Sequence, residues 1–152
     1  MPRRLRIRIG RAAGIAEFLE EDAPRTTDLI WGILPLEGHA MPSIVGGAEI
    51  FLPLPHPLHA PMENQTIYPI PGDLTFYLQP TSYLPSLTAV SHERHREVIG
   101  FVYGRDAQIY GPVVPLPLNL FATITEGLQD LAAEIGRMRR EGFDLLTLSR
   151  LE

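Results

Sequence analysis

Hydrophobic and polar positions alternate at the start of the chain and then change their period. Leu5, Ile7 and Ile9 alternate with arginines, and this period of two predicts a strand with one buried face. Residues 12–21 and 26–34 instead carry apolar side chains at three- and four-residue steps. That spacing predicts one or two short helices laid across one end of a sheet.

The middle of the chain alternates between strand-forming runs and proline-rich loops. Proline cannot donate a ladder hydrogen bond, so residues 53–61 and 112–117 are expected to be loops or sheet edges. The runs between them are apolar, aromatic or β-branched, which is typical of strands. These predicted strands are residues 48–54, 74–78, 84–90, 98–103 and 118–125.

The clearest helical pattern lies near the C-terminus. An apolar stripe runs from Leu128 to Met138, and the residues Thr123–Glu126 before it have the spacing of a capping box. Thr125 is an equally good cap. Gly142 follows three arginines and predicts the end of the helix. Residues 143–148 predict a closing strand.

These elements define one fold class. A chain of 152 residues, 45% of them hydrophobic, is the size of one domain with one core, so residues 1–152 are predicted to form a single domain. Many short strands with regular turns predict a mainly β protein. We expect a closed or nearly closed β-barrel with a C-terminal amphipathic helix and short N-terminal helices.

Composition excludes several kinds of chemistry. The chain has no cysteine, which removes disulfides, thiolate metal sites and a cysteine nucleophile. It has no lysine, which removes Schiff-base chemistry and a phosphate-loop lysine. The net charge of -5 argues against nucleic acid or an anionic membrane as a partner. No apolar run is long enough to span a membrane, so a cytoplasmic protein is expected. Because the residues for these cofactor chemistries are missing, no cofactor is expected either.

Two stretches carry a family resemblance. Residues 63–66 read Glu-Asn-Gln-Thr, residues 69–73 read Pro-Ile-Pro-Gly-Asp, and a strand containing Tyr77 follows. Residues 119–127 precede the C-terminal helix. Together they resemble an uncharacterised bacterial family with a cyclophilin-like fold. The resemblance implies a cyclophilin-like closed barrel.

The same resemblance implies a small-molecule function. Related cyclophilin-like domains form parts of amide-cleaving enzymes that act on urea derivatives and cyclic lactams. The family's string of residues before the next strand survives here only in part: His39 is kept, a tryptophan is missing, and Glu49 is the nearest counterpart of the family's glutamate. No Arg-centred string with a Phe-His pair occurs, so prolyl isomerase activity is not expected.

Five polar residues are the predicted ligand-binding set. Glu63 and Asn64 place a carboxylate beside a carboxamide, which can orient an amide-, urea- or carboxylate-bearing metabolite. His39, Glu49 and Tyr77 are expected to line the same pocket. Glu63 is the candidate catalytic base if apolar walls raise its pKa. The alternative is that Glu63 lies on the surface and Asn64 stabilises a turn.

Two His-x-x-His pairs are weak metal candidates. His56 and His59 lie in a stiff proline-rich loop close to Glu63, while His92 and His95 lie in a polar connection. A zinc site needs a third rigidly held protein ligand, and solvated histidines are the simpler interpretation. No metal is therefore predicted, with His56 and His59 as the better pair.

A second function hypothesis is a non-catalytic subunit. Segment 50–60 carries Phe51, Leu54 and Leu58 among prolines, so its side chains are not expected to enter one barrel core together. Exposed apolar side chains favour association. This hypothesis predicts a homo-oligomer, most simply a two-fold dimer, or a subunit that docks on an amide-hydrolysing enzyme through this segment and residues 112–118.

Overall fold

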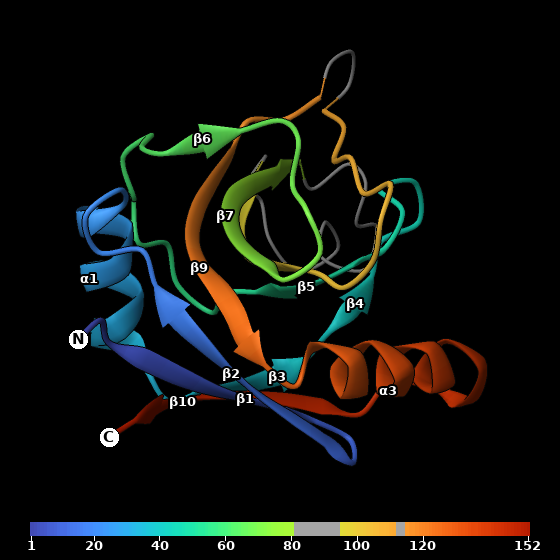
Figure 1. Ribbon diagram of the computed structural model, residues 1–152. Coiled ribbons are helices and arrows are strands. Elements are labelled where there is room, and N and C mark those ends of the chain that lie inside the picture. Colours follow the sequence, from blue (N-terminus) through green and yellow to red (C-terminus); the bar gives the residue numbers. More distant parts are fainter. Residues whose placement is uncertain (81–94, 112–114) are drawn as a thin grey trace.

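The computed structural model describes residues 1–80, 95–111 and 115–152, and it shows a mainly β protein (Figure 1). The helices are α1 Pro24–Ile33 and α3 Leu128–Glu141. The strands are β1 Arg4–Ile9, β2 Ala12–Phe18, β3 Leu36–His39, β4 Met41–Pro42, β5 Glu49–Pro53, β6 Gln65–Thr66, β7 Asp73–Pro80, β8 His95–Val102, β9 Leu118–Glu126 and β10 Leu145–Leu151. No helix in the described ranges is long and apolar enough to cross a membrane.

All these strands belong to one antiparallel sheet that curls back on itself. The order is β3-β10-β1-β2-β9-β7-β8-β5-β4, and β6 pairs with β9. The two edge strands are consecutive in the chain and are joined through Ala40, so residues 36–42 pair with β10 through their first half and with β5 through their second. No ladder of backbone hydrogen bonds joins β3 to β4, so the described sheet has two ends and is not closed. The prediction of a closed barrel is therefore wrong, while the mainly β class is confirmed.

The first hairpin corrects one predicted helix. β1 is confirmed, but residues 12–18 form its antiparallel partner β2. The buried positions there are Gly14, Ala16 and Phe18, which recur every second residue. Alanine and glycine have small side chains, so their alternation gives only a weak hydrophobic pattern. The larger apolar residues here are three or four positions apart, which predicts a helix. Pairing with β1 nevertheless makes this segment a strand. The turn between the strands uses Gly10 at a φ of 52°.

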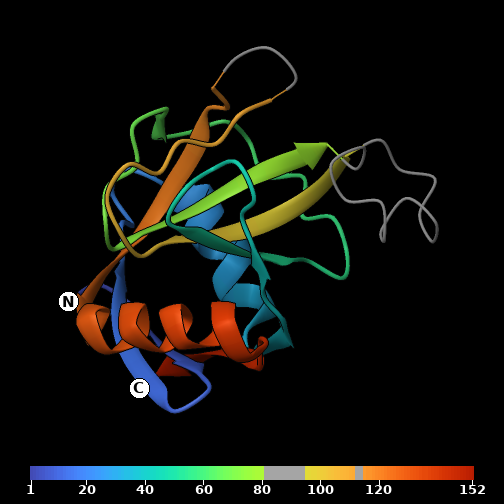
Figure 2. The same ribbon diagram turned by 90° about the vertical axis from the view of Figure 1, so that its right-hand side faces the viewer.

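Both described helices lie where the sequence places them, but their first residues differ. α1 begins at Pro24 rather than at a threonine cap and ends at Ile33, just before Pro35. α3 begins after Gly127, which has a left-handed φ of 81°, so the predicted threonine caps lie in β9. Gly142 ends α3 as predicted, and its N–H donates to the Met138 carbonyl. Figure 2 shows α3 lying across one end of the sheet.

Most of the remaining predicted strands are confirmed. β5, β7, β8, β9 and β10 lie at the predicted places within a few residues. β8 already begins at His95, three residues before the predicted start of this strand. The predicted strand 84–90 lies outside the described residues.

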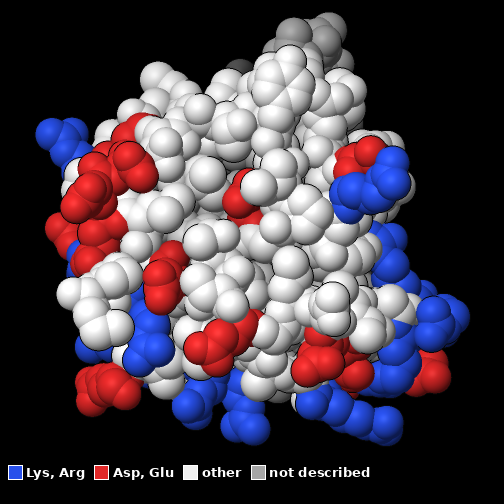
Figure 3. All heavy atoms as spheres, in the orientation of Figure 1, with Lys and Arg blue, Asp and Glu red and all other residues white. Residues whose placement is uncertain are grey.

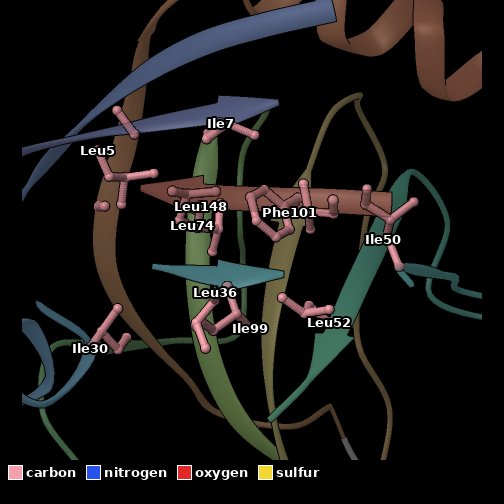
Figure 4. Close-up of a cluster of buried hydrophobic side chains, with 14 of the residues drawn as sticks. Leu5, Ile7, Ile30, Leu36, Ile50, Leu52, Leu74, Ile99, Phe101 and Leu148 are labelled. Atoms are coloured by element: carbon pink, nitrogen blue, oxygen red, sulfur yellow. The ribbon is translucent and has the colours of Figure 1, made fainter. Parts of the chain in front are cut away.

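The inner face of the curled sheet encloses the main core. Side chains from strands distant in the sequence point into one interior (Figure 4). The members labelled there include Leu5, Ile7, Ile30, Leu36, Ile50, Leu52, Leu74, Ile99, Phe101 and Leu148. α3 adds Leu131, Ile135 and Met138 to this core. The interior is thus filled by apolar side chains.

The first half of segment 50–60 is buried, because Ile50, Phe51, Leu52 and Leu54 are all enclosed, and this contradicts the premise of the predicted interface. β5 is covered on both faces: Ile50, Leu52 and Leu54 enter the main core, while Phe51 enters a second apolar cluster on the opposite face. Its apolar side chains do not need to share one core, because two cores are available. Residues 50–54 therefore leave little apolar surface for a partner subunit.

Burial of Leu54 predicts a large effect on stability. Leu54 is 2% exposed, so Leu54→Ala should lower the free energy of unfolding by about 2–5 kcal/mol through a cavity in the core. Ile44 is 92% exposed, and Ile44→Ala should change it by less than about 0.5 kcal/mol. Chemical denaturation measures both. Equal changes in the free energy of unfolding for the two substitutions would contradict the burial of Leu54.

Candidate functional site

A buried polar group lies on the outer face of the three strands β5, β8 and β7. Alternation along β5 turns Ile50 and Leu52 to the main core and Glu49 to the other face, and β7 likewise presents Thr75 and Tyr77 there. Glu49, Thr75 and Tyr77 have exposed fractions of 0%, 0% and 4%. Three polar side chains are thus enclosed on a face that also carries an apolar cluster.

The absence of a side chain at residue 100 brings these groups together. Gly100 of β8 lies between β5 and β7, paired with Phe51 on one side and Thr75 on the other. A Cβ atom there would lie 2.6 Å from Thr75 Oγ1, 3.1 Å from Glu49 Oε2 and 3.2 Å from Tyr77 Cε1. Because β8 presents no side chain at this point, the Tyr77 ring reaches across it to a strand two positions away.

Glu49 and Tyr77 form the central contact. The Tyr77 hydroxyl donates to Glu49 Oε1 at 2.9 Å. Burial raises the pKa of Glu49 to about 8, and the Tyr77 hydrogen bond opposes this only in part. Burial, followed by the Glu49 charge, raises the pKa of Tyr77 well above its ordinary value. Glu49 is therefore mainly a neutral carboxylic acid at neutral pH.

Two oxygens of this group have no hydrogen-bond partner in the described structure. Glu49 Oε2 and Thr75 Oγ1 are both fully buried and unpaired, and both lie within about 3 Å of the point that a Cβ atom of residue 100 would occupy, where there is no room for a side chain. A buried polar atom without a partner costs about 1–3 kcal/mol. Native proteins keep few such atoms, and each one calls for an explanation. Here two of them converge on one point.

Apolar side chains cover the group. Phe51, Tyr77, Val98, Ile109 and Leu118 form the second cluster, with Met41 and Leu116 packed against it. The chain before β5 adds to the cover, since the N–H of Gln108 donates to the Gly46 carbonyl at 2.9 Å. This enclosure is the source of the desolvation that keeps Glu49 neutral.

Arg139 of α3 fixes the chain next to Glu49 without touching its carboxyl group. Its guanidinium lies 3.4 Å from the backbone carbonyl oxygens of Ser43, Gly47 and Glu49. It also lies over the ring of Tyr103, 5.7 Å from the ring centre. Arg139 therefore anchors the loop that leads into β5, and its positive charge interacts with backbone carbonyl groups rather than with the Glu49 carboxyl group.

Glu63 and Asn64 hold the fold together at a different place. α1 begins after Ala23, which has no capping side chain, and Glu63 Oε1 accepts the Thr26 N–H at 2.5 Å in its stead. The Asn64 side chain donates to the Leu120 carbonyl at 2.8 Å. No hydrogen bond joins either residue to Glu49 or Tyr77 in the described structure, so the predicted five-residue set is not assembled.

Asn119 links the same region. Its side chain accepts the Glu63 N–H at 3.3 Å and donates to the Pro61 carbonyl at 2.7 Å and to Thr26 Oγ1 at 3.2 Å. This network fastens the chain after the proline-rich loop to α1 and β9. The geometry supports the structural interpretation of the Glu63-Asn64 pair rather than the catalytic one.

The predicted histidines remain apart from the buried group. His39 is an exposed residue of β3 paired with Leu145, and His56 and His59 are exposed in the proline-rich loop. The described residues contain no group of three metal-binding side chains. The prediction that no metal is bound stays a prediction, and the second pair cannot be assessed because His92 lies outside the described ranges.

Glu97 is a further buried carboxylate that fastens the proline-rich loop. Its Oε1 accepts the N–H groups of Leu58 and His59 at 2.8 and 2.9 Å. One oxygen binding two backbone donors is the pattern of a structural anchor. Glu97 thus explains how a loop poor in ladder hydrogen bonds is held against the sheet.

Sequence reasoning found Glu49 and Tyr77 but missed Thr75 and Gly100. Thr75 lies two residues before Tyr77 on one strand, so the period of two was a usable signal for a shared face. Gly100 interrupts an apolar strand, and a glycine there indicates close approach of another group. Neither signal specifies which strand lies beside which.

Comparison with known proteins identifies the family. Residues 5–150 match the family described as protein of unknown function (DUF3830). The chain therefore belongs to this family. Comparison with curated proteins gives no sequence match.

Two solved structures share the fold. The structure of McbB in complex with tryptophan superposes with a TM-score of 0.63 at 14% identity, covering 96% of this chain and 44% of McbB. This chain thus spans less than half of McbB. The solution structure of the hypothetical protein AF2241 from Archaeoglobus fulgidus gives a TM-score of 0.57 at 22% identity, covering 99% of this chain and 95% of that one. Neither comparison names a cyclophilin-like domain, so that part of the resemblance stays a prediction.

The raised pKa of Glu49 predicts how stability depends on pH. Between its ordinary value of 4.5 and about 8, the unfolded chain loses the Glu49 proton while the folded protein keeps it. The folded state then binds more protons, so its stability falls as pH rises through this window. From 4.5 to about 8, at about 1.4 kcal/mol per pKa unit, the loss is on the order of 5 kcal/mol.

Glu49→Gln isolates this effect. The neutral amide should match the wild-type free energy of unfolding near about pH 5 and exceed it near about pH 8. Urea denaturation across the range measures both proteins, and Glu21→Gln at an exposed position is the control. Parallel pH curves for wild type and Glu49→Gln would contradict a neutral buried Glu49.

Proposed function

We propose that this protein binds a small polar molecule at Glu49, Thr75 and Tyr77. The observation that carries the proposal is the convergence of two unpaired buried oxygens, Glu49 Oε2 and Thr75 Oγ1, over Gly100. A ligand that hydrogen-bonds both would remove the cost of burying them. The proposed site keeps Glu49 and Tyr77 from the predicted set and adds Thr75.

The environment of the site suits recognition. Most of its walls are apolar and a few polar groups converge, which is the usual composition of small-molecule sites. McbB, which shares this fold over part of its length, is known in complex with tryptophan. That likeness supports small-molecule binding by a protein of this fold and does not name the ligand here.

Entry of a ligand requires its cover to shift. Glu49 and Thr75 have no exposed surface, and the described part of the cover includes Ile109 and Leu116. These residues belong to the long connection between β8 and β9 rather than to the sheet. Residues outside the paired strands open at a lower cost than the strands do, so the described residues around Ile109 and Leu116 are the proposed place of entry.

Thr75→Val tests the proposed site. Valine keeps the shape of threonine but removes the unpaired hydroxyl, so the free protein should be as stable as wild type or more stable. Binding should be lost at the same time. The measurement is the movement of the Val98 and Ile109 methyl NMR signals during titration with tryptophan, acetamide, urea and acetate.

A matched control is available on the surface. Thr147→Val removes a hydroxyl of β10 whose only hydrogen bond in the described structure is a 3.4 Å surface contact with Glu37, and it should change stability little and leave binding unchanged. Movement of the two methyl signals in wild type, its loss in Thr75→Val and its retention in Thr147→Val are expected. Binding that survives in Thr75→Val would place the site elsewhere.

A homo-oligomeric or accessory subunit is the second candidate function. Figure 3 shows mostly white surface in the middle of the upper part of the face, between charged groups at its left and right. Four of the well exposed large apolar side chains in the described ranges lie in residues 62–70 and in the connection before β9. They are Met62 at 83%, Tyr68 at 74%, Ile70 at 63% and Tyr110 at 44%. Exposed apolar groups on neighbouring segments favour contact with a second copy or with a partner enzyme. The proposed contact thus moves from segment 50–60 to these residues.

Oligomeric state tests this candidate. The double substitution Tyr68→Asp with Ile70→Asp should convert a wild-type dimer to monomers, as measured by light scattering. Ile44→Asp, at an exposed apolar position on another loop, should leave the dimer intact. A wild-type protein that is monomeric at high micromolar concentration would exclude self-assembly through this surface.

A further inference from the structure

The direction of the Tyr77 hydrogen bond fixes where Glu49 can carry a proton. The Tyr77 hydroxyl donates to Glu49 Oε1, so Oε1 acts as an acceptor. The proton of a neutral Glu49 carboxyl group then belongs on Oε2. That oxygen has no partner in the described structure and, like Thr75 Oγ1, faces the backbone of Gly100. The unpaired oxygens therefore offer a ligand one acid O–H donor and one hydroxyl.

No positive charge faces this pair of oxygens in the described structure. The Arg139 guanidinium contacts the backbone carbonyl of Glu49 rather than its carboxyl group. Arg105 and Asp106, in the covering connection, pair with each other in solvent. Strand β8 contributes Val98, Gly100 and Val102 to this face, and β4 contributes Met41. Tyr77 is thus the one titratable side chain that contacts the Glu49 carboxyl group in the described ranges.

We infer that this site selects uncharged ligands with a hydrogen-bond acceptor beside a donor, as in an amide, and binds them through the protonated Glu49 carboxyl group. The inference rests on the proposed function and narrows it, because it rejects the carboxylate-bearing ligand. Glu49 Oε2–H donates to the ligand carbonyl, and Thr75 Oγ1 accepts the ligand N–H. No covalent step is involved.

Electrostatics explain why an amide should bind in preference to a carboxylate of the same shape. A carboxylate ligand would bring a negative charge into an enclosed site without a cation to balance it, and an unpaired buried charge is strongly unfavourable. An amide of the same shape brings no charge and offers both hydrogen bonds. Burial keeps Glu49 protonated near neutral pH, with its pKa raised to about 8, while Tyr77 stays neutral because its own pKa is raised further.

Matched amide and carboxylate probes test the inference on the full chain. Acetamide is paired with acetate and benzamide with benzoate, and each is titrated against wild type at about pH 6 and about pH 9.5 while the Val98 and Ile109 methyl signals are followed. The amides should bind at the lower pH and at least about tenfold more weakly at the higher one, since the acid form is then depleted. The carboxylates should not bind at either pH.

Two further measurements separate the possible outcomes. In Glu49→Gln the ratio of the two amide dissociation constants should fall below about twofold, since the titrating group is gone. Calorimetry of wild type at about pH 9 in buffers of different ionisation enthalpy should show about one proton taken up per amide bound. Near-ultraviolet circular dichroism confirms that each protein is folded at both pH values.

The result that overturns the inference differs from the one that overturns the site. A carboxylate that binds more tightly than its matched amide, or amide binding with no pH dependence and no proton uptake, contradicts selection by a protonated Glu49 while leaving a binding site in place. If no probe of either charge moves the two methyl signals, the proposed function fails and the inference fails with it.

Discussion

The central constraint on this structure is that β5, β7 and β8 are buried on both faces. Their inner side chains fill the core of the curled sheet, and their outer side chains are covered by the connection between β8 and β9. Every residue at the centre of these strands must therefore satisfy one of two enclosed environments. A carboxyl group such as Glu49 has no route to solvent in this arrangement, and its chemistry follows from that enclosure.

Two-sided burial also explains why the local sequence of β5 is unusual. Residues 49–53 read Glu-Ile-Phe-Leu-Pro, and their first four side chains are all buried. A half-exposed strand would alternate between apolar and polar residues, as β1 does. Continuous hydrophobicity is the pattern of a strand covered on both sides. From the sequence alone, this pattern predicts apolar surface that a partner would bury, whereas the structure provides a second apolar cluster within the same domain.

The sequence predicted the positions of strands and helices along the chain better than it predicted which strands lie side by side in the sheet. Strong periodicity placed β1 and α3, and proline and glycine placed several boundaries. Residues 12–18 failed because alanine and glycine make a weak period. The same distinction applies to the site: some of its residues were predicted, but their contact was not. Glu49 and Tyr77 were selected from the family resemblance and not from their geometry, and their contact depends on Gly100, which lies on the strand between them. Such contacts depend on strand order, which one sequence does not contain.

Glu63 has a consequence for the order in which the protein folds. α1 has ten residues, begins without a capping side chain of its own, and receives its cap from a residue 37 positions later in the chain. A helix of this length is marginal in water by itself. Its first turn is thus completed by a contact that forms only after a long loop closes, and such contacts form slowly. We expect α1 to become stable late, together with the chain that follows the proline-rich loop, although its residues precede that loop in the sequence.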